Sequence, residues 1–303
     1  MLRLCPEKVI DSDWMKWKGY KVDWDNPRDI NEKIQWLMFR SDTSLWSLCS
    51  DKYRVREYVK SKGLEDILVP LLGVWEKAED IDFEALPQKF VIKCNHDSGS
   101  AVIADRSKGP VDVSGIRAEL NRHLKVKYGF EHGEMYYNRI KPLILAEQFL
   151  EPGDPTVSDS PVDYKVWCFG GVPKWIMCCS NRTEESLELS VYDLDWNYYP
   201  EHVLSGGHYI HPANPLPRPK ELETILSFAA RLSEGFPEVR VDFYETGGKV
   251  YFGEMTFASL CGKMNYYSDS FLEELGRECV LPERVFPKTS ATKSRSPFVN
   301  TKK

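Results

Sequence analysis

Two carboxylates and a guanidinium occur in one short hairpin sequence, VRVDFYETGGKVYFGEMTF, at residues 239–257. Side chains two residues apart on a strand share a face, so Arg240 and Asp242 point to the same side, and a Gly-Gly turn brings Glu254 level with them. Two carboxylates on one face repel each other unless a cation lies between them, and Mg²⁺ binds such oxygens together with substrate phosphates. The hairpin therefore predicts a magnesium site in which Arg240 meets phosphate oxygens. The competing interpretation is a salt-bridged hairpin whose polar face is in water.

A second candidate phosphate site follows an apolar strand in the sequence FVIKCNHDSGSA. Lys93 ends the strand, and Ser98, Gly99 and Ser100 form a loop whose N–H groups and hydroxyls can hold phosphates. The spacing of a Walker A loop is absent, so a plain β-turn is the simpler interpretation of this segment alone. A later strand, LILAEQFL, changes from apolar residues to Glu-Gln and could be a hinge whose backbone contacts an adenine edge.

The composition is that of an ordinary globular protein. Of the 303 residues 42% are hydrophobic, and a net charge of −6 argues against binding to nucleic acid. No apolar run approaches the length of about 18 residues that a membrane span needs, and the first residues show no secretory signal. The cysteines lie largely in apolar runs without metal-ligand spacing, which favours reduced thiols and a cytoplasmic location.

The elements that must position these residues alternate irregularly between helix and strand, which favours an α+β or α/β fold. We expect helices at 29–42, at 50–63, at 113–128 and at 219–237, with Asp29 or Asn31 capping the first. Strands are expected at 89–105, interrupted by the loop, and at 141–154. Hairpins are expected at 163–182, turned at Gly170-Gly171, and at 239–257, while 195–218 is loop-like.

The order of these features resembles the ATP-grasp superfamily, and most closely its TupA-like (teichuronopeptide-biosynthesis) branch. The matching segments are NEKIQWL, DKYRVREYV, LPQKFVIKCNHDSGS, DYKVWCFGG and the 239–257 hairpin, which together span roughly residues 28 to 277. The resemblance implies an α+β ATP-grasp fold in which two α+β subdomains clamp ATP between antiparallel sheets. The expected parts are a helical N-terminal extension (1–50), a first subdomain with the phosphate-binding loop (51–146), a hinge and second subdomain with the magnesium site (147–286), and a disordered basic tail (287–303).

The resemblance also implies a nucleotide site. The lysines and the loop would contact the phosphates, and the remaining residues would surround the adenine and the ribose. The residues implied are Lys52, Lys93, Asn95, Ser98, Gly99, Ser100, Glu147, Gln148, Leu150 and Asp163.

Catalytic and metal roles are implied in the same way. Arg240, Lys165 and Arg182 would contact the transferred phosphate or an acyl phosphate. Asp242 and Glu254 would hold Mg²⁺, with Thr256 where many ATP-grasp ligases have asparagine. Because a hydroxyl is the weaker ligand, the number of Mg²⁺ ions, one or two, stays open.

The expected reaction is ATP-dependent ligation of a carboxylate to an amine through an acyl phosphate. The branch is associated with bacterial cell-surface and capsular polysaccharides, so a uronic acid or its nucleotide-linked form would suit as the carboxylate. Two alternatives stay open: a glycosyltransferase that uses the Asp193–Asp195 triplet, and a nucleotide-binding protein without catalysis. No nucleic-acid partner and no stable membrane insertion are expected, although the basic tail could touch an anionic membrane surface.

Overall fold

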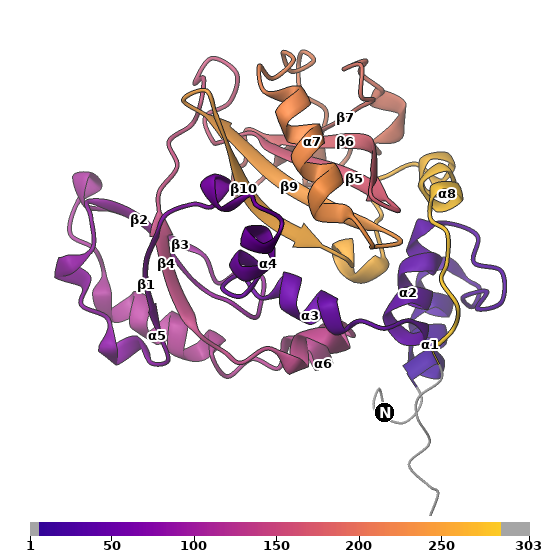
Figure 1. The fold of residues 1–303 in the computed structure, drawn as a ribbon, viewed down its shortest axis with the longest axis horizontal. Helices are drawn as coiled ribbons and strands as arrows, with labels where there is room; N and C mark the ends of the chain where they lie inside the picture. Colours follow the sequence, from indigo (N-terminus) through magenta and orange to yellow (C-terminus); the bar gives the residue numbers. More distant parts are fainter. Residues whose placement is uncertain (1–5, 286–303) are drawn as a thin grey trace, which may run out of the picture.

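Two β-sheets form the framework of the fold, and the mixed α+β architecture that the sequence predicts is confirmed. The computed structural model describes residues 6–285, so the basic tail expected at 287–303 lies outside the described residues. Figure 1 shows one sheet at the left of the molecule and the other above its centre, with a cluster of helices at the right. Within the described residues, no helix is long and apolar enough to cross a membrane.

The first sheet has four strands in the order β1-β4-β2-β3, all paired antiparallel. One of its faces is covered by α5, below the sheet in Figure 1. Asp112 caps α5 by accepting a hydrogen bond from the backbone N–H of Gly115 at 2.9 Å. The elements of this part are β1 (Leu71–Trp75), β2 (Lys89–Cys94), β3 (Val102–Asp105), α5 (Val113–His123), α6 (Tyr128–His132) and β4 (Ile144–Gln148).

The second sheet has six strands in the order β10-β9-β5-β6-β7-β8. All neighbouring strands run antiparallel except β7 and β8. The helix α7 packs across β5, β6 and β9 on one face (Figure 1), which leaves the other face free for polar side chains. The elements are β5 (Asp163–Phe169), β6 (Val172–Ser180), β7 (Leu187–Tyr192), β8 (Tyr209–Ile210), α7 (Leu222–Ser233), β9 (Val239–Thr246) and β10 (Lys249–Thr256).

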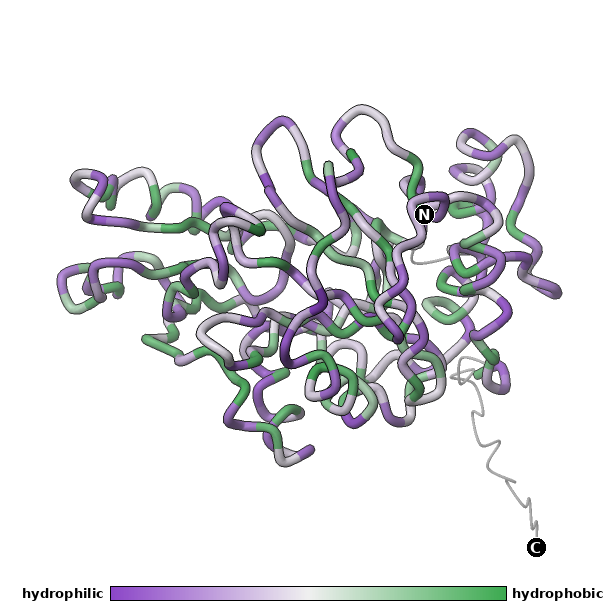
Figure 2. Tube along the Cα trace, turned by 90° about the horizontal axis from the view of Figure 1, so that it is seen from above, coloured by the Kyte–Doolittle hydropathy of each residue, from purple (hydrophilic) through white to green (hydrophobic). Residues whose placement is uncertain are grey.

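The remaining helices gather beside the second sheet. They are α1 (Pro6–Lys18), α2 (Ile30–Arg40), α3 (Ser44–Ser50), α4 (Val55–Ser61) and α8 (Asp269–Glu278). Although α4 precedes the first sheet in the chain, its Val55 and Val59 belong to the hydrophobic core of the second sheet. The first sheet has a separate core, which includes Phe90 and Ile92 of β2 and Leu120 of α5. Figure 2 shows that hydrophobic stretches follow the interior segments, while hydrophilic stretches follow many of the outer loops.

Several predicted elements are confirmed with shifted ends. Asp29 caps α2 by accepting the backbone N–H of Glu32 at 2.9 Å, and the two Gly-Gly hairpins form as expected. The helix predicted from residue 50 to 63 is shorter, because the Asp51 carboxylate accepts the N–H groups of Tyr53 and Arg54 and holds a turn before α4 begins. The helix predicted at 113–128 was likewise too long, since α5 ends at His123 and a separate helix, α6, begins at Tyr128.

Candidate active site

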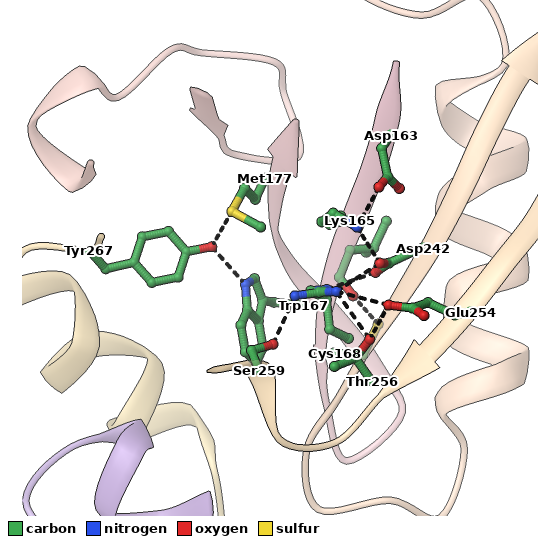
Figure 3. A network of polar contacts seen from close by, with 12 residues as sticks. Asp163, Lys165, Trp167, Cys168, Met177, Asp242, Glu254, Thr256, Ser259 and Tyr267 are labelled. Atoms are coloured by element: carbon green, nitrogen blue, oxygen red, sulfur yellow. Dashed lines mark hydrogen bonds and ion pairs between the residues drawn. The ribbon is translucent and has the colours of Figure 1, made fainter. Parts of the chain in front are cut away.

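A row of charged side chains crosses three strands of the second sheet. Lys165 of β5 pairs with Asp242 of β9, which in turn pairs with Glu254 of β10. Directly opposed residues on neighbouring strands project from the same face of a sheet. A bulge at Gly253 shifts the register of β10 and brings Glu254, rather than its neighbour, opposite Asp242. The two carboxylates therefore lie on one face, as Figure 3 shows.

Asp242 is the most enclosed member of this row. Its carboxylate accepts two hydrogen bonds from Arg240, from Nε and Nη2 at 2.8 Å each, and a third from the ammonium of Lys165. Lys165 also contacts Asp163 at 2.5 Å, so its ammonium bridges two acids (Figure 3). Burial alone would lower the pKa of Lys165, but Asp163 and Asp242 raise it, and Lys165 stays charged. The remaining carboxylate oxygen of Asp163, Oδ1, is buried without a hydrogen-bond partner.

Glu254 differs from Asp242 in its exposure, because its side chain is 46% exposed. Its carboxylate accepts a hydrogen bond from the hydroxyl of Thr256 at 2.8 Å and contacts Arg240 Nη2 at 3.4 Å. Burial would raise the pKa of Glu254, but the positive charges of Lys165, Arg240 and Lys52 lower it to about 2. Glu254 is therefore an ionised carboxylate with room for a further ligand.

Two further lysines of the site, Lys93 and Lys52, come from segments outside the second sheet. Lys93 at the end of β2 forms an ion pair with Glu147 of β4 at 2.6 Å, and Glu147 also contacts Arg56 at 3.3 Å. Lys52 lies between α3 and α4, and its ammonium donates to the backbone carbonyl of Asp97. Burial lowers the pKa of Lys52, against the opposing effect of Glu254. The site thus receives cations from two parts of the chain that precede the second sheet.

A cavity of about 490 Å³ connects these groups. It takes its charged lining from both sheets and from Lys52, and its apolar lining includes Val91, Ile103 and Phe149. Ile103 is a large apolar side chain that is 64% exposed on β3. The predicted site residues that line this cavity are Lys52, Lys93, Glu147, Gln148, Leu150, Asp163, Lys165, Arg182, Asp242 and Glu254.

The predicted loop after β2 is present, but its residues have different roles. Asn95 is fully buried and does not line the cavity, since its amide donates to Asp51 at 2.8 Å and accepts the N–H of Leu143 at 2.7 Å. Ser100 donates its hydroxyl to Asp97 at 2.6 Å. This bond and a contact with the imidazole of His123 hold the carboxylate of Asp97 in place within the loop. Asn95 therefore has a structural role, whereas Asp97 and the loop segment 98–100 line a second cavity, and of these residues Ser98 and Gly99 are exposed.

A second cavity of about 500 Å³ adjoins the first and shares Lys52, Lys93, Lys165, Arg182 and Glu254 with it. Arg240, Thr256 and the loop segment 98–100 line this second cavity instead of the first. Its further lining was not predicted from the sequence, because four tyrosines and one glutamate from short, separate segments form no recognisable motif. These residues include Tyr128, Glu134, Tyr137, Tyr209 and Tyr266.

The charges of the first cavity balance one another. The acids are Glu147, Asp163, Asp242 and Glu254, and the bases are Lys52, Lys93, Lys165 and Arg182. A ligand that carries several negative charges would leave this balance strongly negative. A divalent cation that enters with such a ligand would restore much of it.

The donor set fits a magnesium ion that takes its other ligands from phosphate oxygens. Asp242 and Glu254 present carboxylate oxygens on one face, although Arg240 and Lys165 contact both oxygens of Asp242, and Asp163 Oδ1 is a buried oxygen that lacks a partner. The described residues contain no group of three or more acids, histidines or cysteines placed to hold a metal by themselves. Thr256 fits less well, because its hydroxyl donates to Glu254 and accepts from Arg240 at 3.0 Å.

Two antiparallel-rich α+β units that enclose a cavity lined by lysines and acids define the ATP-grasp class of fold. The chain belongs to the TupA-like ATPgrasp family, whose model matches residues 32–280. No curated protein matches the sequence. The predicted family and fold are thereby confirmed.

Solved structures similar to this chain include ATP-grasp ligases. D-alanine–D-alanine ligase from Helicobacter pylori is 15% identical over 84% of this chain and 68% of that chain, with a TM-score of 0.43. The Bacillus anthracis enzyme is 17% identical over 69% of this chain, with a TM-score of 0.38, and its complex with ATP is 16% identical over 75%, with a TM-score of 0.41. This chain spans only 57% and 60% of those two Bacillus anthracis chains.

Proposed function

We propose that this chain is an ATP-dependent carboxylate–amine ligase that works through an acyl phosphate. The observation that carries the proposal is the row Lys165–Asp242–Glu254, which shares one cavity with Lys52 and Lys93. A cavity that is apolar in one part and densely charged in another suits a nucleotide, since a base needs the first environment and phosphates need the second. The use of ATP favours a cytoplasmic site of action.

In the first step, an oxygen of the substrate carboxylate would bond to the γ-phosphorus of ATP. The bond from this phosphorus to the β–γ bridging oxygen would break, and ADP would leave with the electron pair. Lys52, Lys93 and Lys165 would offset the charge that develops on the phosphoryl oxygens. Mg²⁺ held by Asp242 and Glu254 would supply further charge neutralisation on the phosphates.

In the second step, an amine would attack the carbonyl carbon of the acyl phosphate, and phosphate would leave as the amide forms. Arg240 is held by Asp242, Thr256 and Ser259, the last through a hydrogen bond from Nη1 at 2.8 Å, so its guanidinium is fixed beside the second cavity. Arg182 is exposed and lines both cavities, so it is free to meet an anionic group of the substrate. The loop segment 98–100 would exclude water from the acyl phosphate.

We also propose a uronic acid, free or nucleotide-linked, as the carboxylate, in cell-surface polysaccharide synthesis. The support is family membership together with a cationic and tyrosine-rich second cavity. The rival metal motif at Asp193–Asp195 has a local use, because the Asp193 carboxylate accepts the N–H of Asn197 at 2.8 Å and holds a turn. Neither aspartate lines the two cavities described above.

A hydroxylamine trap tests the proposal directly. The protein is incubated with ATP, Mg²⁺, hydroxylamine and a panel of uronic acids and their nucleotide esters. Formation of a hydroxamate together with ADP identifies the carboxylate that is activated. Release of UDP from a UDP-sugar without ATP would instead support a glycosyltransferase. Stabilisation by ATP against unfolding with no product from any carboxylate would leave a nucleotide-binding protein without catalysis.

A further inference from the structure

Two buried acids that the proposed first step does not use line the second cavity, Asp97 and Glu134, and Asp97 is taken up by contacts within its loop and with His123. Glu134 lies between α6 and the 3₁₀ helix η5 (Met135–Arg139), and it is 4% exposed. The chain reaches this position because α6 ends at Gly133, whose left-handed conformation (φ 81°) turns the backbone. No pattern in the sequence YGFEHGEMYYNR marks the residue, since acids beside glycine commonly face water.

Two neighbours orient the carboxylate of Glu134. The hydroxyl of Tyr136 donates to Oε2, and the thiol of Cys261 donates to Oε1 at 3.4 Å. Cys261 belongs to the 3₁₀ helix η7 (Ser259–Gly262), where it and Leu260 have positive φ angles of 56° and 45°. Such angles are costly for residues other than glycine, so the packing around this segment holds the thiol in place.

Glu134 is also the one acid lining the two cavities, within residues 6–285, that has no lysine, arginine or histidine side chain in contact. Lys93 and Arg56 pair with Glu147, and Lys165 pairs with both Asp163 and Asp242. Arg240 contacts Glu254, and the imidazole of His123 contacts Asp97. Within residues 6–285, the carboxylate of Glu134 accepts hydrogen bonds only from a hydroxyl and a thiol. A cationic group of a ligand would complete this arrangement, because buried carboxylates are normally paired.

The charged groups around Glu134 place it within electrostatic reach of the phosphate side of the site. Burial raises its pKa to about 7, against the hydrogen bonds from Tyr136 and Cys261, with smaller effects of Glu254 and Lys52. Burial also raises the pKa of Tyr128 and Tyr137, and it raises that of Cys261 to about 12, so these groups stay protonated near neutral pH. The further titratable group on this side is His132 of α6.

We infer that Glu134 binds the ammonium group of the amine substrate and takes one of its protons. The inference rests on the proposed ligase function and names the second cavity as the amine site. The ammonium would give one proton to the Glu134 carboxylate, and the freed lone pair would form the C–N bond at the carbonyl carbon. The C–O bond to phosphate would break, phosphate would leave with that electron pair, and it would carry away the second proton of the nitrogen.

The test compares two nucleophiles in the variant Glu134→Gln, which keeps the shape of the side chain. Hydroxylamine is largely neutral near pH 7 and needs no base, whereas amino acids and ethanolamine are protonated there. With the carboxylate found in the trap, we expect amide formation from these amines to fall by about 10²–10⁴, the usual contribution of a general base. Hydroxamate formation should fall by less than roughly tenfold. In the unaltered protein the rate of amide formation should increase through about pH 7 as Glu134 loses its proton, and the variant should lose this increase.

Matched controls separate catalysis from folding. Glu131→Gln replaces an exposed acid of α6 outside the second cavity and should leave both rates unchanged. Equal loss of both products in Glu134→Gln would show a structural role and overturn the inference, as would retention of both. An inflection near neutral pH that survives in Glu134→Gln and disappears in His132→Asn would assign the titration to the imidazole instead. Absence of hydroxamate with the unaltered protein would refute the ligase function itself, and this inference with it.

Discussion

Glu254→Gln is the substitution that best separates the chemistry of this site from its stability. The Glu254 side chain is 46% exposed, and its contacts are one ion pair at 3.4 Å and one hydroxyl at 2.8 Å. A half-exposed ion pair contributes about 1 kcal/mol or less, so the free energy of unfolding should fall by no more than that. If Glu254 acts on the phosphates, directly or through a metal, the loss of its charge should raise the barrier by about 2.7–4 kcal/mol, a rate loss of about 10²–10³.

Asp242→Asn should behave differently, although the two acids face each other across the hairpin. Asp242 is 1% exposed and is held by Lys165 and Arg240. Removing its charge takes away the two shortest contacts of Arg240 to an acid and one of the two acids that Lys165 bridges, and breaking such a buried pair costs about 3–5 kcal/mol of stability. This variant should therefore lose both its activity and a large share of its free energy of unfolding.

The assay measures ADP release at saturating ATP and Mg²⁺ together with urea unfolding of the same preparations. Glu245→Gln is the matched control, because Glu245 projects from the opposite face of β9 and lines neither cavity. The reasoning is refuted if Glu254→Gln releases ADP at nearly the unaltered rate. A loss of stability in Glu254→Gln as large as that in Asp242→Asn would also contradict it, since Glu254 would then be a structural residue.

Three further substitutions test separate parts of the argument. Lys93→Ala should lower the rate of ADP release by about 10²–10³. The free energy of unfolding should change little, because Glu147 keeps Arg56 as a partner at 3.3 Å. A normal rate would show that Lys93 does not act on the phosphates. Glu238 is fully buried without a hydrogen-bond partner in the described structure, and burial raises its pKa well above the ordinary value of 4.5. At a pH above 4.5, Glu238 is deprotonated in the unfolded state but stays protonated in the folded state. The free energy of unfolding therefore falls as pH rises, by up to about 1.4 kcal/mol per pH unit. Glu238→Gln should flatten this decline in urea unfolding between pH 5 and pH 8, and an equal decline in both proteins would contradict the assignment. Gly276→Ala in α8 should lower the free energy of unfolding by about 1–3 kcal/mol, because a Cβ there would lie 2.9 Å from the backbone of Asp29, which caps α2. A gain in stability, since alanine is the better helix former, would show that α2 and α8 can move apart.

The sequence allowed two hairpins of the second sheet, β5–β6 and β9–β10, to be predicted, but not β7 or β8, and β8 lies in a segment that was expected to be loop-like. Period-2 spacing placed Arg240 and Asp242 on one face, and the Gly-Gly turn predicted the hairpin, but the bulge at Gly253 was not foreseen. Helix ends were predicted less well; for example, the Asp51 carboxylate binds two backbone N–H groups and holds a turn, so that α4 begins only at Val55. The residues around Glu134 could not be found, because they meet only through contacts between η5 and η7.

What the sequence alone determined is the family, the α+β class, and the strands that carry the acids and lysines, since local periodicity and short motifs encode these features. Only the tertiary structure decided which of those residues share a cavity. In the folded protein Asn95 is held by structural hydrogen bonds, and Arg240 and Thr256 line the second cavity and not the first. Glu134, which no motif marks, also lines the second cavity. The physical reason is that a side chain's partners are chosen by packing between segments distant in the chain. A motif fixes the type of each residue and leaves its neighbours undetermined.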